Sequence, residues 1–325
     1  TVVLLLGVTT GLTFLPVASA QQPPPPSEPD VIMRVNVDLV VLPVSVTDDR
    51  YRAYGGLQAE NFQVYENGVR QKITNVEEKD SPISVGLVFD ASGSVTPSIE
   101  ICRAAVRTFF RFANPEDEYF LIEFSSRPVL LVPFTSESNQ ILRHVGAART
   151  GGRTALYDAV YRALAEMQKA RHQRRVLLIL SDGIDNFSTF TERDIQSVLA
   201  RMENSVQIYT LGVTQVGNFQ LLQDMLPREV RMGPVNLARL AEMSGGHSFL
   251  LNGPGKLLDT VGRISRELRA QYEVTYQSSS EAGMGEWRSV RVEVQPPSGA
   301  PPLEVRTRPG YFAIPRPISS SRQPN

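Results

Sequence analysis

Four near-continuous apolar runs constrain the fold of this chain more than any other feature. They cover residues 83–89, 119–124, 176–180 and 206–213. A strand with one wet face would alternate apolar and polar residues, so unbroken runs are typical of strands buried on both faces of a parallel sheet. Parallel strands need crossover connections, and the stretches between these runs are long enough to supply them.

Amphipathic stretches between and after the apolar runs predict the crossover helices. The expected helices span residues 97–112, 155–170, 192–202, 236–243 and 256–270. Thr191 and Asp194 form a capping pair at the start of one of them. Strand and helix therefore alternate through residues 82–270, which predicts an α/β fold with a doubly wound, mostly parallel sheet.

Two flanking segments read differently, because apolar and polar residues alternate in them at the period of a strand. Residues 31–81 precede the α/β region, and residues 271–313 follow it without a helical pattern. The first segment contains Glu66-Asn67-Gly68, which predicts a hairpin turn. Each segment is too small to bury a core alone, so we expect the two to pair into a small β-sandwich with the α/β domain inserted between them.

The two ends of the chain carry segments of a different kind. Residues 1–20 are largely apolar and end in Ala18-Ser19-Ala20, the small-x-small pattern that signal peptidase accepts. A membrane anchor is the alternative, but Pro16 interrupts the run, and a span needs about 20 apolar residues. We expect a signal peptide, a proline-rich linker at residues 21–30 and a disordered tail at residues 314–325.

These segments and the overall charge set expectations for location and partners. Signal cleavage would export the protein to the periplasm, the cell surface or the medium, with no integral membrane span left. Lys and Arg together number 33 and Asp and Glu 34, so the net charge is -1. Without an excess of positive charge, the chain is not expected to bind nucleic acid. Cys102 is the single cysteine, so no intramolecular disulfide can form, and its spacing favours a helix core position.

Oxygen-bearing side chains follow the apolar strands. Asp90-Ala91-Ser92-Gly93-Ser94 comes directly after residues 83–89, Thr154 opens a predicted helix, and Asp182 follows residues 176–180. Ligands of open α/β sheets bind at the carboxyl ends of the strands, so Asp90, Ser92, Ser94, Thr154 and Asp182 should meet at one edge. The sequence therefore predicts a group of two carboxylates and three hydroxyls.

Such a group suits a hard divalent cation. Mg²⁺ takes about six oxygen ligands and keeps some waters, and Mn²⁺ and Ca²⁺ are the alternatives. Two carboxylates roughly neutralise the ion, while neutral hydroxyls leave it electrophilic toward an outside carboxylate. A Glu or Asp of a partner protein is thus the expected remaining ligand.

The same five residues, Asp90-x-Ser92-x-Ser94 with Thr154 and Asp182, resemble the metal-ion-dependent adhesion site of von Willebrand factor type A domains, also found in integrins. The resemblance covers residues 82–270 and implies a Rossmann-like fold. In that family the serines and threonine bind the cation directly or through water, the aspartates often act through water, and a partner carboxylate completes the shell. The resemblance thus implies a non-enzymatic binding protein.

A second resemblance is carried by the flanking segments. Val46-Thr47-Asp48, Phe62-Gln63-Val64-Tyr65-Glu66-Asn67-Gly68 and Arg308-Pro309-Gly310-Tyr311-Phe312 are similar to a bacterial exported family related to von Willebrand factor type A proteins. These motifs are less specific than the five-residue set. They imply that the β segments and the α/β domain occur together.

Other interpretations of the same residues remain open. Ser92 and Ser94 are also favoured as turn and N-cap residues, and Asp185 is either a further ligand or a solvated loop residue. Asp90 could serve a haloacid-dehalogenase-like phosphotransferase, although the acid expected two residues later is Ser92. A structural module with a vestigial site is the third alternative. The three histidines show no zinc-ligand spacing.

Overall fold

The computed structural model describes residues 39–50, 52–79, 81–202, 205–214, 225–252, 254–269, 271–280 and 285–313. The described residues all lie in one compact unit of the chain, Val37–Asn325. The predicted signal peptide, proline-rich linker and C-terminal tail lie outside the described residues. No helix in the described ranges is long and apolar enough to cross a membrane.

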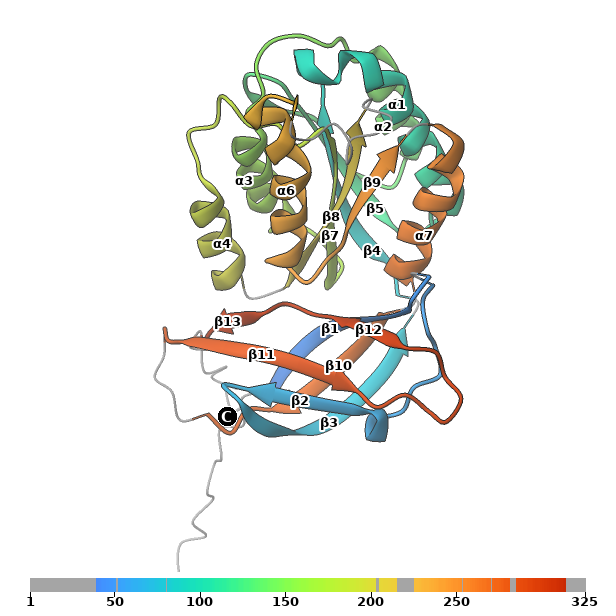
Figure 1. Cartoon of the computed structure of the whole chain (residues 1–325), viewed down its shortest axis with the longest axis vertical. Coiled ribbons are helices and arrows are strands. Elements are labelled where there is room, and N and C mark those ends of the chain that lie inside the picture. Colours follow the sequence, from blue (N-terminus) through green and yellow to red (C-terminus); the bar gives the residue numbers. More distant parts are fainter. Residues whose placement is uncertain are drawn as a thin grey trace, which may run out of the picture. The chain divides into compact units, whose positions relative to one another are not determined.

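A six-stranded sheet forms the centre of the α/β domain (Figure 1). Its strands, in spatial order, are β6 (Pro128–Thr135), β5 (Glu118–Phe124), β4 (Ile83–Asp90), β7 (Arg174–Ser181), β8 (Val206–Thr214) and β9 (Ser248–Asn252). All neighbours pair in parallel except β6, which runs antiparallel to β5. Every residue of β4 is buried, as its apolar run predicts. The mostly parallel α/β fold is therefore confirmed.

Helices cover both faces of this sheet (Figure 1). One face carries α1 (Ile99–Phe109), α2 (Ser138–Ala147) and α7 (Leu257–Arg269), and the other carries α3 (Leu156–Met167), α4 (Glu192–Arg201) and α6 (Arg228–Glu242). Each set packs its apolar residues into a separate core against the sheet. The sequence patterns predicted a residue range for neither helix α2 nor strand β9, and they did not predict the first half of α6 or strand β6.

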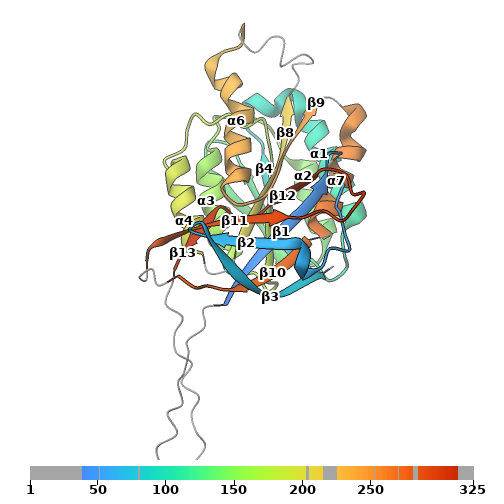
Figure 2. The same cartoon turned by 60° about the horizontal axis from the view of Figure 1, so that its bottom comes forward.

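A second, seven-stranded sheet is built from both flanking segments. Its strands, in spatial order, are β12 (Leu303–Arg306), β1 (Leu39–Asp48), β10 (Gln271–Gln277), β3 (Val69–Lys79), β2 (Phe62–Glu66), β11 (Trp287–Val294) and β13 (Gly310–Phe312). All pairs are antiparallel, and strands from before the α/β domain (β1, β2 and β3) pair with strands from after it at β12–β1, β1–β10, β10–β3 and β2–β11. The expected pairing is present, but the strands form one curled sheet around a single core rather than two stacked sheets (Figures 1 and 2).

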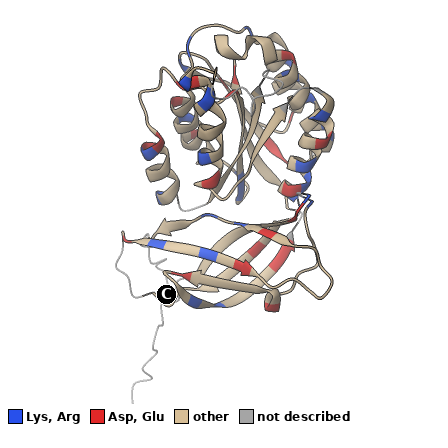
Figure 3. Ribbon diagram, viewed as in Figure 1, with Lys and Arg blue, Asp and Glu red and all other residues tan. Residues whose placement is uncertain are grey.

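The hairpin between β2 and β3 follows the predicted turn. Asn67 and Gly68 both have positive φ, 49° and 78°, as a two-residue type I′ connection requires. The Thr191 and Asp194 capping box at the start of α4 is also present. Basic and acidic residues are interspersed along helices and strands, in keeping with the balanced charge of the chain (Figure 3).

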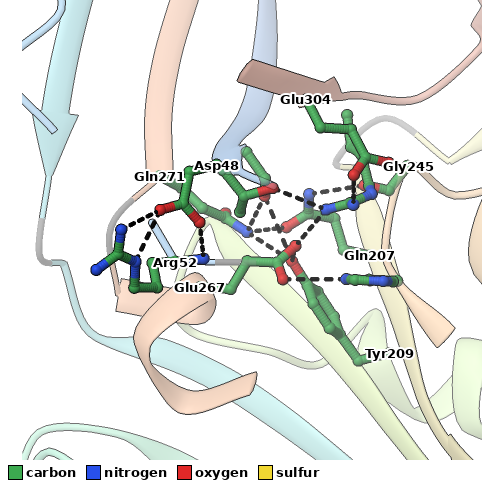
Figure 4. Close-up of polar contacts among 12 residues, drawn as sticks. Asp48, Arg52, Gln207, Tyr209, Gly245, Glu267, Gln271 and Glu304 are labelled. Carbon is green, nitrogen blue, oxygen red and sulfur yellow. Dashed lines mark hydrogen bonds and ion pairs between the residues drawn. The ribbon is translucent and has the colours of Figure 1, made fainter. Parts of the chain in front are cut away.

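Buried hydrogen bonds join the two sheets (Figure 4). Gln271, the first residue of β10, donates through Nε2 to Ser45 Oγ of β1 at 3.1 Å and to Gln207 Oε1 of β8 at 2.8 Å. Its Nε2 also lies 3.2 Å from the hydroxyl of Tyr209, another β8 residue. A side chain of one sheet therefore satisfies polar groups of both.

Candidate functional site

The predicted residues lie at the carboxyl ends of β4 and β7, which are neighbours in the sheet. Asp90 is the last residue of β4, and Asp182 follows Ser181, the last residue of β7. The parallel register pairs Phe89 with Leu180, so the two strands end at the same level. The two aspartates consequently stand at one edge of the sheet, as the strand ends predict.

Asp90 is fully buried, at 0% exposure, and both of its oxygens accept hydrogen bonds. Oδ1 accepts from the Ser92 amide at 2.8 Å, and Oδ2 accepts from Ser181 Oγ at 2.5 Å. Burial, followed by the charge of nearby Asp182, raises the pKa of the Asp90 carboxyl to about 7 despite these bonds. Ser181 was not predicted, although a polar residue closing an apolar strand was a visible signal.

Asp182 is the second carboxylate of the site and is partly buried. Burial raises its pKa, while hydrogen bonds from Ser94 and from the Ile184 amide, the latter 3.0 Å from Oδ1, act in the opposite direction. Neither carboxylate forms an ion pair with a basic side chain in the described part of the chain. Two like charges thus share a desolvated site without a counter-ion from the protein.

The serines lie between the two carboxylates in the hydrogen-bond pattern. Ser92 Oγ and Ser94 Oγ are 3.0 Å apart, Ser92 is buried, and Ser94 is exposed. Ser92 occupies the N-cap position of a short 3-10 helix, Gly93–Ser98, but its side chain makes no capping bond. Ser92 therefore stands at the N-cap position, as the alternative interpretation expects, but its hydroxyl does not cap the helix.

Thr154 comes to the site on the loop before α3. Two backbone bonds hold this loop to the one after β4: Gly151 N donates to Ala91 O at 2.9 Å, and Gly93 N donates to Gly152 O at 3.1 Å. Thr154 is 1% exposed. The structure brings its loop to the aspartate loops, and no hydrogen bond joins its side chain to Asp90 or Asp182 in the described part of the chain.

Asp185 and Asp158 connect the loop after β7 to helix α3. Asp185 Oδ1 accepts from the Leu156 amide at 2.8 Å and from Ser188 Oγ at 2.5 Å, which ties the loop to the first turn of α3. Asp158 Oδ1 accepts from the amides of residues 189 and 190, each at 2.8 Å. Asp185 is partly buried, and the two interpretations considered for it, a further ligand and a solvated loop residue, both stay predictions.

Helix α6 packs directly against the backbone that carries Asp182. A Cβ placed on Gly233 of α6 would lie 2.3 Å from Asp182 O, and one on Gly183 would lie 2.1 Å from Gly233 O. Gly183 also has a φ of +78°, a conformation that favours glycine. Asn236 Nδ2 donates to Gly183 O at 3.0 Å. Glycines on both sides are thus required for this close approach.

The chemistry of the donor set fits a hard cation more closely than a soft one. No three His, Cys, Asp or Glu side chains within the described ranges gather where they could hold a metal ion. The predicted set instead combines two carboxylates with hydroxyl oxygens, which are ligands of Mg²⁺, Ca²⁺ and Mn²⁺. Cys102 lies in the α1 core, where burial first, and then the charges of Asp90 and Asp182, raise its thiol pKa to about 12.

Residues 85–184 match the family model described as the von Willebrand factor type A domain. The chain contains a von Willebrand factor type A domain. The matched segment runs from β4 to just beyond β7 and includes all five predicted site residues. Domains of this type are generally interaction modules rather than enzymes, and typically mediate contacts between proteins.

Several solved structures are similar to the chain. BatB from Bacteroides thetaiotaomicron has 15% identity and a TM-score of 0.46, covering 58% of this chain and 100% of that one. A von Willebrand factor type A protein from Catenulispora acidiphila has 9% identity and a TM-score of 0.48, covering 86% and 74%. Proximal thread matrix protein 1 from the mussel byssus has 15% identity and a TM-score of 0.48, covering 63% and 51%. No curated protein matches the chain.

Proposed function

We propose that this von Willebrand factor type A protein binds a partner protein through a divalent cation and a carboxylate of the partner. Asp90, Ser92, Ser94, Thr154 and Asp182 would hold the cation, with Mg²⁺ the expected ion. The bound ion would supply a Lewis-acidic position for an oxygen ligand from outside. The protein would act without making or breaking a covalent bond.

The observation that carries this proposal is the buried pair of carboxylates without a protein counter-ion. Desolvation of an ionised carboxylate costs several kcal/mol unless an opposite charge or hydrogen bonds offset it. Asp90 receives two hydrogen bonds, yet burial and Asp182 still raise its pKa to about 7. A divalent cation would remove this conflict by neutralising both charges at once.

The hydroxyls support a position for an outside ligand. Thr154 and Ser94 are neutral oxygens, so a cation that they share with two carboxylates keeps its affinity for anions. Ser94 is exposed, whereas Asp90 and Ser92 are buried, so the open side of the set lies toward solvent. A carboxylate is the protein group that best completes such a shell.

The geometry is less suited to the phosphotransferase alternative. A nucleophilic carboxylate needs an oxygen free to attack the substrate. Asp90 is 0% exposed and uses both oxygens in hydrogen bonds, and Ser92 stands where the acid would be expected. A structural module with a vestigial site would not bind the cation, so a measurement of cation affinity distinguishes this alternative from the proposal.

We also propose that the protein is exported. The support is the apolar segment at residues 1–20 with its Ala18-Ser19-Ala20 ending, and the proline-rich stretch that follows it. Export would place the adhesion site in the periplasm, at the cell surface or in the medium. Protease accessibility of the protein in intact cells, compared with lysed cells, tests this placement.

Calorimetric titration with Mg²⁺ and Mn²⁺ tests the metal site. The wild-type chain should bind one cation, and Asp90→Ala and Asp182→Ala should remove binding while circular dichroism shows a retained fold. Thr154→Ala should weaken it. Asp259→Ala is the matched control, because it removes an exposed carboxylate from α7 far along the chain from the site. Equal affinity in the wild type and Asp90→Ala would reject the site, and absence of binding at millimolar cation would favour the vestigial alternative.

A further inference from the structure

Two exposed side chains flank Thr154 at the solvent side of the proposed metal site. Arg153 precedes Thr154 in the chain, and the Phe187 amide donates to Thr154 O at 3.0 Å. The guanidinium carbon of Arg153 lies 5.2 Å from the centre of the Phe187 ring, within the range of a cation–π contact. Phe187 is 48% exposed, so the rim of the site carries an aromatic ring open to solvent.

Backbone contacts on both sides hold this pair in place. The Arg153 amide donates to Ser126 Oγ at 2.9 Å, and the Thr154 amide donates to Asn186 Oδ1 at 2.9 Å. Thr154 O also accepts from the Asn186 amide at 3.0 Å. A residue fixed before a ligand arrives loses less conformational entropy on binding, so these contacts favour a recognition role for the pair.

The Arg153 guanidinium forms no ion pair with a carboxylate among the described residues. A cation–π contact with Phe187 does not use the N–H donors of a guanidinium that lies flat on the ring, so such an arrangement leaves them for an acceptor. Arg127 lies in the turn after β5, beside Ser126, and Arg149 follows α2; both are exposed. Three exposed arginines therefore lie on the loops beside Thr154, in addition to Asp182 and Asp185, although the whole chain is nearly neutral.

The charge balance of the metal site suggests a role for Arg153. Two aspartates roughly neutralise a divalent cation, so a carboxylate arriving from a partner adds negative charge to the site. Arg153 would offset that charge, and its planar fork is suited to bind a carboxylate through two parallel hydrogen bonds. A second acidic residue on the partner could thus bind Arg153, next to the cation.

We infer that the site selects partner segments with two acidic residues close together in sequence. One carboxylate would complete the cation shell, and the second would bind Arg153, with Phe187 packing against the carbon atoms between them. Arg153 and Phe187 are then specificity-determining residues for an acidic peptide. This inference rests on the proposed function and names the class of partner for the same site.

Short peptides titrated into the Mg²⁺-loaded chain at low ionic strength test the inference by calorimetry. The diacidic probes are acetyl-Gly-Glu-Glu-Gly-amide and acetyl-Gly-Glu-Gly-Glu-Gly-amide, and the monoacidic probes carry Gln in place of the second Glu. At least one diacidic peptide should bind about fivefold tighter than its monoacidic counterpart, the gain typical of an exposed charge pair. Arg153→Gln should weaken diacidic binding more than monoacidic binding and so remove this gap in affinity, and Phe187→Leu should narrow it.

Arg193→Gln is the matched control, because Arg193 is an exposed arginine of α4 and the substitution makes the same charge change. It should preserve the gap. Equal affinity for diacidic and monoacidic peptides in the wild type would overturn the inference, and so would an Arg153→Gln chain that weakens both kinds equally. Both results leave the proposed function standing. Failure of every peptide to bind, together with failure to bind Mg²⁺, would overturn the proposed function itself.

Discussion

At the scale of single residues, Asp90 is the side chain whose placement is hardest to explain by stability. It is fully buried and close to a second carboxylate, and hydrogen bonds from Ser181 Oγ and from Ser92 offset this cost in part. An apolar residue at the end of a buried strand would avoid this cost. The cost is therefore better explained by a function of the carboxylate, in keeping with the proposed cation.

Asp90→Asn should stabilise the metal-free protein at pH 8 while abolishing Mg²⁺ binding. The pKa of Asp90 in the folded state, about 7, is above its ordinary value of 3.8, so the folded state holds the extra proton between these pH values. The free energy of unfolding of the wild type should then fall as pH rises from about 4 to about 7 and level off above that. At pH 8 the ionised, buried carboxylate is a cost that Asn does not carry.

Urea unfolding in EDTA at pH 5.5 and pH 8 measures this effect. The wild type should lose about 1 kcal/mol or more between the two values, and Asp90→Asn should lose less. Added Mg²⁺ should stabilise the wild type and leave the variant unchanged. Wild-type stability that stays constant over this range would contradict the buried, unpaired state of Asp90.

At the scale of elements, the position of the Asp182 loop depends on how closely α6 approaches it. Gly233 in α6 lies against Asp182 O, and Gly183 lies against Gly233 O. Helix α6 therefore supports the site although none of its residues belongs to the predicted ligand set. A change in its distance from β7 should move Asp182 relative to Asp90.

Gly233→Ala should weaken cation binding and lower stability. The new Cβ would meet Asp182 O at 2.3 Å, so either α6 or the loop must shift. Overpacking of this kind costs about 1–3 kcal/mol, and the shift should also reduce Mg²⁺ affinity. Urea unfolding and calorimetry on the same preparations give both quantities.

Gly146→Ala is the matched control for this prediction. Gly146 is also a helical glycine, in α2, and a Cβ there meets no atom within 4 Å. The substitution should be neutral or stabilise by up to about 1 kcal/mol, because alanine favours a helix. If the two alanine variants behave alike, the close packing of α6 does not position the site.

Each element that was missed or given no range has a feature that weakens its sequence pattern. Pro128 and Pro133 argue against a strand, yet β6 is an edge strand, where proline is tolerated. Helix α2 buries only a narrow face, centred on Ile141 and Val145. Gly233 and Pro234 interrupt the helical pattern of α6, and the packing of its glycine explains why that sequence is there.

The positions of the candidate ligands, by contrast, could be predicted because strong sequence patterns precede them. Asp90 and Asp182 follow long apolar runs whose parallel pairing places their ends together, so the position of a strand end predicts the position of its side chain. The supporting residues Asn186 and Asp158 act through contacts between loops and α3, which no local pattern encodes. Their roles required the three-dimensional structure.

At the scale of the whole molecule, buried polar groups connect the α/β domain to the seven-stranded sheet (Figure 4). The Tyr209 hydroxyl, on β8, donates to Glu267 Oε1 of α7 at 3.2 Å and lies 3.4 Å from Ser45 Oγ of β1. Glu267, 1% exposed, also lies 3.4 Å from Arg306 Nη1 of β12. Since breaking such contacts leaves buried polar groups unsatisfied, separation of the two parts should be costly.

The two parts should therefore unfold in a single transition, and the chain offers a separate probe for each. Its single tryptophan, Trp287, lies in β11 of the seven-stranded sheet, whereas the long helices that dominate far-ultraviolet circular dichroism flank the six-stranded sheet. In urea the fluorescence and circular dichroism midpoints should coincide. Tyr209→Phe removes one buried hydroxyl at nearly constant volume and should lower both midpoints together, by about 1–2 kcal/mol in unfolding free energy.

Tyr65→Phe provides the control for that change, because the Tyr65 hydroxyl donates only to Gln63, on its own strand, at 2.8 Å. It should shift the two midpoints little. A fluorescence transition that separates from the circular dichroism transition in the wild type would mean that the sheets unfold independently. In that case the buried contacts of Tyr209, Gln271 and Glu267 would not couple the α/β domain to the sheet built from both flanking segments.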